Sequence, residues 1–335
     1  MYRKGFKILI LAFVVVPIMI FILQVDFVLV WEGLRRIGSG FFVILLVTFI
    51  AYTLGTMGWW ICLGSERSNI SLWQLFGIRQ VGETVGLYNP SSVVGGDMLK
   101  NELLKSYSIS KDRALESVVV SRVTALLSQQ LLLAVSLCWL AATIATSLQT
   151  FGRYGIAVLI GLLLLFKIFF FYLLNRKRNQ VLPNLEDCCS IWQRFRRILY
   201  KLTTQAQYFF QHKKKLFWWS YFFFFLHWVV GGLEFYLILR FLNYDIELMD
   251  SVWMDMGVML FKSVGAFIPG QLGIEELGNK LLLASISIQA ASVWVTVSIL
   301  RRARQLCWII VGAICYIFIR KIDSFKILKD GNTVR

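Results

Sequence analysis

Charged residues are scarce in this chain of 335 residues. Lys, Arg, Asp and Glu together make up 16% of it, and 58% of the residues are hydrophobic. Soluble domains carry about 25% charged residues, so a soluble enzyme of this size would need more charge on its surface. The abundance of apolar side chains also excludes an intrinsically disordered chain. The composition that remains is that of a polytopic membrane protein.

The sequence also lacks the motifs of several common chemistries. Its six cysteines have no paired spacing of the kind that forms disulfide or zinc frameworks. No Walker loop, HExxH, GxSxG or EF-hand pattern is present. We therefore expect no metal and no cofactor, we assign no catalytic residue, and ATP-driven transport would need a partner protein.

Acidic residues are outnumbered by basic ones, 19 against 35, which gives a formal net charge of +16. Such an excess occurs in nucleic-acid-binding proteins. In a chain this apolar, the positive-inside bias of membrane proteins explains it more simply. We therefore expect a membrane, and no nucleic acid, as the partner.

Six charge-poor runs are long enough to cross a bilayer core of about 30 Å, which takes about 20 helical residues. They cover residues 8–25, 37–65, 123–152, 154–175, 216–239 and 284–319. The first follows three basic residues and is too long for the apolar part of a cleaved signal peptide, so we interpret it as a retained signal anchor. The expected fold is an all-α polytopic membrane protein, one integral membrane domain over residues 1–335, with about six full transmembrane helices.

Two further apolar stretches, residues 72–98 and 252–283, are interrupted by Pro and Gly, which break helices. Irregular backbone at membrane depth persists only where protein or a wet cavity satisfies its polar groups. We therefore interpret both stretches as re-entrant or broken helices; a surface loop for the first and a kinked span for the second are the alternatives. The residues assigned to the breaks are Pro90, Gly95, Gly96, Pro269, Gly270 and Gly273.

The distribution of Lys and Arg predicts the orientation. Residues 176–215 carry ten Lys and Arg against two acidic residues, and both ends of the chain are basic. The positive-inside rule then places this loop and both termini in the cytoplasm, with the protein in the plasma membrane. Apolar residues at helical spacing within 191–202, flanked by Arg, predict an amphipathic helix on an anionic leaflet. The same basic loop is a candidate docking site for a partner.

The chain resembles itself at an offset of 179 residues. Over residues 85–130 the shift gives 11 identities in 46 positions. Two of the identities involve residue types that are scarce within apolar segments: Pro90 with Pro269 and Arg122 with Arg301. The shift also brings Asp97 onto Glu276. We expect repeat 1 at about 37–152 and repeat 2 at about 216–319. On the predicted topology they enter the membrane from opposite sides, which is the inverted-repeat pattern of transporters.

Two segments resemble the signatures of a known family. Asn-Pro-Ser-Ser-Val-Val-Gly-Gly-Asp at 89–97, with Arg122 downstream, is similar to the first signature of the lysylphosphatidylglycerol synthase transmembrane-region family, also called flippase-like membrane proteins. Pro-Gly-Gln-Leu-Gly-Ile-Glu-Glu at 269–276, with Arg301 downstream, is similar to the second, which is usually written with Pro-Gly-Gly-Leu-Gly. Gln271 replaces one of its glycines.

This resemblance implies an integral membrane protein linked to translocation of lipids or polyprenyl-linked intermediates. Relatives with a fused aminoacyl-lipid synthase carry a large soluble C-terminal domain. We expect no such domain in this sequence, because about fifteen residues follow its last predicted span.

Arginine within the last hydrophobic stretch is a strong signal, since a charge at mid-bilayer costs roughly 2.5–3.5 kcal/mol even on the lenient insertion scale. Arg301, Arg302 and Arg304 have 20 charge-free residues before them and 15 after, with no Gly or Pro from 282 to 309. We predict one long helix with these residues in its interior, rather than a basic turn between two short spans. Arg301 and Arg304 share a face and suit a phosphate group.

Arg122 and Lys262 are the other substrate-binding candidates, although Arg122 is equally explained as an anchor at the cytoplasmic interface. Asp97, Glu83 and Glu276 are assigned to charge balance or proton coupling. Caps of helix N-termini explain Asp97 and Glu276 at least as well. Glu83 coincides with Lys262 at the repeat offset, so the two are predicted to pair across the repeat.

Three other polar residues allow interpretations that involve no substrate. His227 and Glu234 are seven residues apart on one face, which fits a His–Glu relay or, more commonly, a helix-packing hydrogen bond. Glu275 is expected to be solvated.

The leading hypothesis is a flippase-like translocator of a phospholipid or a polyprenyl-phosphate-linked intermediate, with membrane lipid as partner and the headgroup phosphate held by intramembrane arginine. A lipid-modifying transferase or hydrolase, with Asp97 or Glu276 as general base, is one alternative. A non-catalytic membrane subunit that docks partners through loop 176–215 is another.

Overall fold

The computed structural model describes residues 27–88, 92–143, 150–176, 191–265, 271 and 273–332, and over these residues it contains helices and turns but no strand. Five helices are long and apolar enough to cross a membrane. They are α3 (Gly40–Cys62), α6 (Lys111–Thr143), α7 (Thr150–Asn175), α9 (Lys214–Phe241) and α12 (Ala291–Asn332). The all-α polytopic class is therefore confirmed. The sixth predicted span, 8–25, lies outside the described residues.

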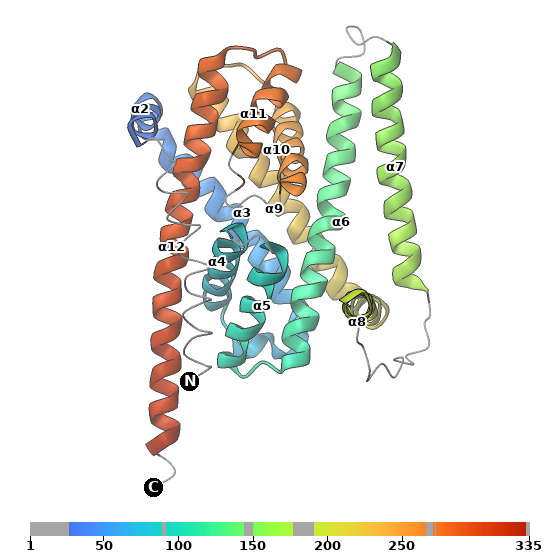
Figure 1. Cartoon of the computed structure of the whole chain (residues 1–335), viewed down its shortest axis with the longest axis vertical. Helices are drawn as coiled ribbons and strands as arrows, with labels where there is room; N and C mark the ends of the chain where they lie inside the picture. The colour runs from blue at the N-terminus through green and yellow to red at the C-terminus, as the bar shows by residue number, and fades with distance from the viewer. Residues whose placement is uncertain are drawn as a thin grey trace.

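Two helical hairpins complete the bundle (Figure 1). The first joins α4 (Leu72–Tyr88) and α5 (Ser92–Leu104); the second joins α10 (Leu248–Val264) and α11 (Ile274–Ser285). None of these four helices exceeds 17 residues, which is shorter than a bilayer crossing needs. In Figure 1 the first hairpin occupies the lower half of the bundle and the second occupies the upper half.

The central contact of the bundle is between α3 and α9, which pack along each other. Two glycines of α3 allow this close approach: a Cβ atom on Gly40 would lie 2.8 Å from the Phe241 ring, and one on Gly58 would lie 2.8 Å from the Phe224 ring. Small residues that let backbones approach are the usual means by which helices associate in lipid. His227 Nδ1, on α9, also lies 2.7 Å from the carbonyl oxygen of Ala51, on α3.

The helices follow the 179-residue offset. The shift places α3 within the range of α9, and it brings α4 and α5 onto α10 and α11 to within a few residues. It also brings the start of α6 to within one residue of the start of α12, which is longer at its C-terminal end. The packing follows the same exchange, because α6 packs against α10 while α12 packs against α4. Each long helix therefore contacts a hairpin helix of the other half, an arrangement that supports the predicted repeat.

One continuous helix contains Arg301, Arg302 and Arg304, as predicted, because α12 runs through all three without interruption. The predicted start of this span, residue 284, is wrong. Helix α11 continues to Ser285, and a turn precedes α12. That turn contains no glycine; Ser287 takes the left-handed conformation instead, with φ 67°.

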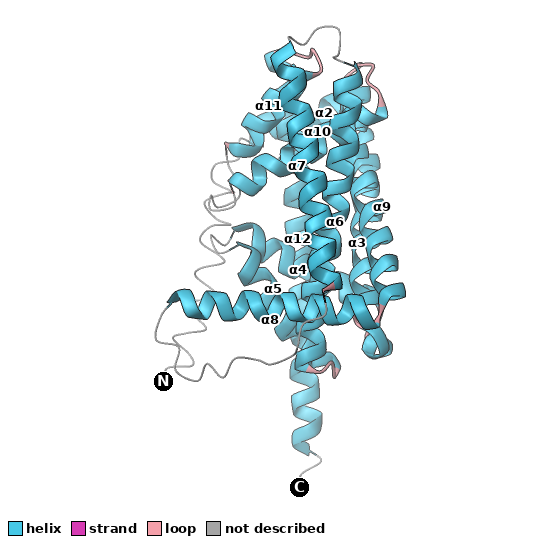
Figure 2. Cartoon of the chain, turned by 90° about the vertical axis from the view of Figure 1, so that its right-hand side faces the viewer, coloured by secondary structure: helices cyan, strands magenta, loops and turns pink. Residues whose placement is uncertain are grey.

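Two helices lie at the edge of the bundle. Helix α7 contacts α6 and α8 and exposes large apolar side chains such as Leu162 and Leu165, as a lipid-facing helix would. Helix α8 (Ile191–His212) confirms the helix predicted from the 191–202 pattern. It runs across the bundle, close to the end at which the C-terminus emerges (Figure 2). Two shorter elements lie elsewhere: α2 (Phe27–Ile37) packs on α12, and η1 (Gly64–Asn69) follows α3.

Candidate functional site

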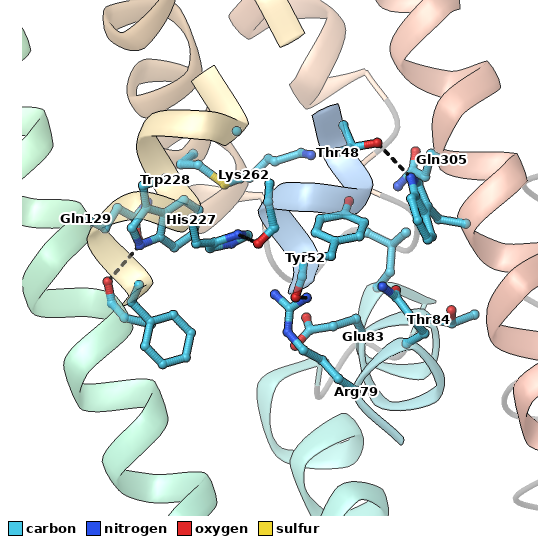
Figure 3. A pocket seen from close by; sticks show the side chains of 18 of the residues that line it. Thr48, Tyr52, Arg79, Glu83, Thr84, Gln129, His227, Trp228, Lys262 and Gln305 are labelled. Carbon is cyan, nitrogen blue, oxygen red and sulfur yellow. Dashed lines mark hydrogen bonds between the residues drawn. The ribbon is translucent and has the colours of Figure 1, made fainter. Parts of the chain in front are cut away.

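A cavity of about 440 Å³ lies in the middle of the bundle (Figure 3). Its walls come from both halves of the chain: α3, α4, α5 and α6 on one side, and α9, α10 and α12 on the other. All four predicted substrate-binding residues line it, namely Arg301, Arg304, Arg122 and Lys262. The fold thus brings together side chains that are up to 182 residues apart in the sequence.

The first cluster of charges belongs to α4, α5 and α6 and consists of Arg79, Glu83, Asp97, Lys100 and Arg122. The Arg122 guanidinium grips Asp97 with two nitrogens, Nε at 2.9 Å from Oδ2 and Nη2 at 2.8 Å from Oδ1. Lys100 Nζ donates to Glu83 Oε1 at 2.5 Å and to Asp97 Oδ1 at 3.2 Å. Arg122 therefore fixes α5 to α6, which the interface-anchor alternative does not require.

Lys100 packs over a position of α4 that is occupied by glycine. Its stem passes over Gly82, where a Cβ atom would lie 2.5 Å from Lys100 Cε. Gly96 packs against the backbone of Gly82 and Gly86, so α4 and α5 meet almost backbone to backbone. Because no side chain separates the two helices here, the acidic and basic groups of the first cluster are brought within bonding distance.

This packing corrects the predicted break in the first hairpin. Gly95 and Gly96 lie inside α5 and are helical, so their assignment to the break is wrong. The small size of Gly96 serves helix packing instead. Pro90, Pro269 and Gly270 lie outside the described residues. In the second hairpin Gly273 directly precedes α11 and has φ 80°, which fits its predicted place at the break.

The second cluster belongs to α9, α10, α11 and α12 and consists of four acidic and four basic residues. They are Glu234, Asp255, Lys262, Glu275, Glu276, Arg301, Arg302 and Arg304. At its centre Arg301 is 2% exposed. Its Nε donates to Glu275 Oε1 at 3.0 Å, and its Nη1 lies 3.3 Å from Glu234 and 3.6 Å from Asp255. Arg301 is also stacked on the Phe235 ring, with its Cζ 4.1 Å from the ring centre.

Arg304 connects this cluster to the first half of the chain. Its Nε donates to the Glu234 carboxylate, and its Nη1 donates to the Tyr52 hydroxyl at 2.8 Å. Tyr52 also accepts a hydrogen bond on its backbone oxygen from Arg79 Nη1, at 3.2 Å. Tyr52 of α3 therefore bonds a basic residue from each cluster, and Figure 3 shows it close to Arg79.

Glu276 acts as a helix cap. Its Oε2 accepts the backbone N–H of Gly273 at 2.8 Å, and its Oε1 accepts from Arg302 Nη2 at 2.8 Å. The capping alternative is thus confirmed for Glu276. Asp97 lies within α5 rather than at its end, and it binds Lys100 and Arg122 instead of a helix terminus.

The predicted pair of Glu83 and Lys262 does not form. Glu83 binds Lys100 and Arg122, whereas Lys262 Nζ binds Glu275 Oε2 at 3.1 Å. Glu83 and Lys262 are each paired within their own half of the chain, although both residues line the same cavity.

The geometry also tests the expectations for His227, Glu234 and Glu275. The His227 ring bonds the Ala51 carbonyl and Glu234 bonds arginine, so these two residues form a packing contact and an ion pair, not a relay. Glu275 was expected to be solvated, and this is wrong: it is 3% exposed and faces Arg301 and Lys262.

Several cavity residues were not among the predicted site residues, and four of them belong to the charged network: Arg79, Lys100, Tyr52 and Asp255. A charge within an apolar stretch could have marked Arg79 and Asp255, whereas nothing in the sequence around Tyr52 marks it. Among the described residues, no three His, Cys, Asp or Glu side chains gather as a metal site would require.

The family model described as "Lysylphosphatidylglycerol synthase TM region" matches residues 7–313 of the chain. This range includes every residue that lines the cavity. No curated protein and no solved structure matches the chain.

Proposed function

The chain belongs to the lysylphosphatidylglycerol synthase transmembrane-region family, and from this membership and the charged cavity we propose that it translocates a phosphate-bearing lipid across the membrane. The substrate is a phospholipid or a polyprenyl-phosphate-linked intermediate. The polar headgroup enters the cavity, and the acyl or prenyl tails stay in the surrounding lipid.

One observation carries this proposal: basic side chains from both halves of the chain line one central cavity. A phosphate group needs positive charge and N–H donors to leave water, and guanidinium groups supply both. The two helical hairpins lie in opposite halves of the bundle. This arrangement suits alternating access, in which a central site opens to one side of the membrane and then to the other.

The basic residues differ in how freely they can bind a headgroup. Arg122 has a side chain that is 39% exposed, and Lys262 is 14% exposed. Arg301 faces three carboxylates and is nearly inaccessible. We assign headgroup binding to Arg122, Lys262 and Arg304, and we assign to Arg301 the role of holding α9, α10 and α11 around the cavity. Glu83 and Asp97 balance the charge of the first cluster.

The carboxylates favour translocation over lipid modification. A general base needs a carboxylate that is free to take a proton. Asp97 is gripped by two arginine nitrogens, and Glu276 is engaged by Arg302 and by the N-terminus of α11. Neither is placed to activate a nucleophile.

Helix α8 supports the membrane orientation that we propose. Its sequence is basic, and it lies across the bundle near the end that carries the C-terminus. We place this end at the cytoplasmic leaflet of the plasma membrane, where basic residues meet anionic lipid headgroups, and we place both termini on the same side. The same face would receive a cytoplasmic partner.

Reconstitution into vesicles tests the function. Fluorescent phosphatidylglycerol and a fluorescent polyprenyl phosphate are placed in vesicles with and without purified protein, and a membrane-impermeant quencher reports probe that reaches the outer leaflet. The protein should speed probe movement well above the protein-free rate. Arg122→Gln should slow it about tenfold or more, since a charge-assisted bond contributes roughly 1.5–3 kcal/mol.

Arg240→Gln is the matched control, because Arg240 is an exposed arginine at the end of α9, outside the cavity. It should translocate like the unchanged protein. A rate equal to that of protein-free vesicles for both probes contradicts the proposal. A new lipid species in the mass spectrum of the same vesicles would favour the transferase alternative.

A further inference from the structure

The charges around the cavity do not cancel in the described part of the chain. The second cluster has four basic and four acidic side chains, but the first has three basic residues, Arg79, Lys100 and Arg122, against Glu83 and Asp97. Buried charge requires a partner. One positive charge, on the side of the first cluster, is left over.

Arg79 is the residue with the unsatisfied charge. Among the described residues, no carboxylate lies within 4.0 Å of its guanidinium, whereas every other basic side chain of the cavity wall has such a partner. Arg79 Nη1 instead donates to the Tyr52 carbonyl at 3.2 Å, and the guanidinium lies 5.2 Å from the centre of the Tyr52 ring. These neutral contacts fix the direction of the side chain without neutralising it.

Arg122 offers a second donor nearby. Its Nε and Nη2 are occupied by Asp97, and within the described residues its Nη1 makes no hydrogen bond. Its contact with Glu83 is long, at 3.4 Å. Glu83 follows Arg79 by one helical turn on α4 and points into the same part of the cavity (Figure 3). Glu83 therefore lies beside both arginines, and within the described residues each of the two guanidiniums has N–H groups that make no hydrogen bond.

We propose that Arg79 and the free edge of Arg122 together hold the phosphate of a phosphodiester lipid, in place of the weak Arg122–Glu83 contact. A phosphodiester carries one negative charge, which matches the one surplus positive charge of the cavity. A phosphomonoester carries nearly two at neutral pH and would leave the cavity negative. This inference rests on the proposed function and narrows its substrate class.

Binding measured by calorimetry on the purified full chain tests the inference. Four short-chain probes separate the contributions: dioctanoyl phosphatidylglycerol, dioctanoyl phosphatidic acid, dioctanoylglycerol, and glycerophosphoglycerol without tails. The first should bind most tightly. Arg79→Gln should weaken its binding about tenfold or more, while the exposed control Arg240→Gln should bind it like the unchanged protein.

Arg79→Lys keeps the charge but loses the two-pronged donor geometry, so it should bind severalfold more weakly and serves where Arg79→Gln does not fold. Folded Arg79 variants with unchanged affinity overturn the inference. Phosphatidic acid that binds more tightly than phosphatidylglycerol overturns the phosphodiester assignment. Equal binding of glycerophosphoglycerol means that the site takes a soluble anion, and this overturns the lipid assignment.

The inference and the proposed function fail separately. Vesicles that show lipid movement with an unaffected Arg79→Gln variant contradict the inference alone. Arg79-dependent binding without any lipid movement in vesicles contradicts the translocator and supports a binding site.

Discussion

Ser108 and Ser287 lie 179 residues apart and share an unusual backbone conformation, with φ 57° and 67°. Each lies in the short turn that leads from a hairpin into a long helix, α6 or α12. A second coincidence falls at the same spacing: Gly64 and Asn243, with φ 62° and 64°, follow the ends of α3 and α9. Left-handed residues other than glycine are uncommon, and three of these four residues are not glycine. Their recurrence at one offset supports descent of the halves from a common unit.

The two serines should face opposite sides of the membrane. Both are exposed, and the proposed inverted topology predicts that Ser108 lies in the cytoplasm and Ser287 outside. In a background without native cysteines, Ser287→Cys should react with a membrane-impermeant maleimide added to intact cells, and Ser108→Cys should react only after the membrane is opened. Labelling of both from the same side would rule out the inverted arrangement.

Helix packing at Gly96 should be intolerant of even a methyl group. In Gly96→Ala the new Cβ atom would collide with the backbone oxygen of Gly82, so α4 and α5 must separate. Overpacking of this kind costs about 1–3 kcal/mol, and the separation also disturbs the Lys100 bonds. Thermal unfolding in detergent should show a clear loss of stability.

Gly155→Ala is the control for this substitution. Gly155 also lies within a helix, α7, but a Cβ atom there would meet no heavy atom within 4 Å. Its melting temperature should stay the same or rise slightly. Equal effects of the two substitutions would show that α4 and α5 do not pack as described.

Arg301 should matter for stability more than any exposed arginine. Arg301→Ala leaves Glu275, Glu234 and Asp255 facing one another without their shared counter-ion. Removing one partner of a buried ion pair costs about 3–5 kcal/mol. Unfolding followed by intrinsic tryptophan fluorescence should reveal this loss. The double variant Arg301→Met with Glu275→Gln should recover part of it; no recovery would mean that the carboxylates are not the source of the effect.

Replacing Gln271 with glycine should increase the stability of the protein. It has φ 53°, a conformation that costs a side-chain-bearing residue about 1–2 kcal/mol. Glycine avoids this cost but loses about 0.5–1 kcal/mol in conformational entropy. Gln271→Gly should therefore raise the stability by up to about 1.5 kcal/mol, whereas Gln305→Gly, inside α12, should lower it. A loss of stability on Gln271→Gly contradicts the left-handed conformation.

The sequence predicted the membrane class and the long helices because these depend on the length and polarity of continuous runs. It also predicted that Arg301 and Arg304 are intramembrane, because scarce charges within apolar segments stand out. The start of α12 was missed because the preceding turn contains no Gly or Pro and relies on Ser287.

Partners of charged residues could not be predicted in the same way. Whether Glu83 meets Lys262 or Lys100 depends on how four helices pack, and the small size of Gly82 and Gly96 decides it by bringing Lys100 over α4. Glu275 and Glu276 are adjacent acidic residues, and the sequence does not say which of them faces inward. The packing decides it, because Glu276 caps the helix and Glu275 faces Arg301. The role of Tyr52 depends entirely on tertiary contacts.

Photocross-linking tests most directly whether a lipid headgroup enters the cavity. A phosphatidylglycerol analogue with a photoreactive group on its headgroup is incorporated into vesicles with the protein, irradiated, and located by peptide mass spectrometry. If the headgroup enters the cavity, adducts are expected on cavity-lining residues such as Thr84 and Gln129, and they should be lost in Arg79→Gln. Adducts confined to the exposed face of α7, at residues such as Leu162 and Leu165, would contradict it.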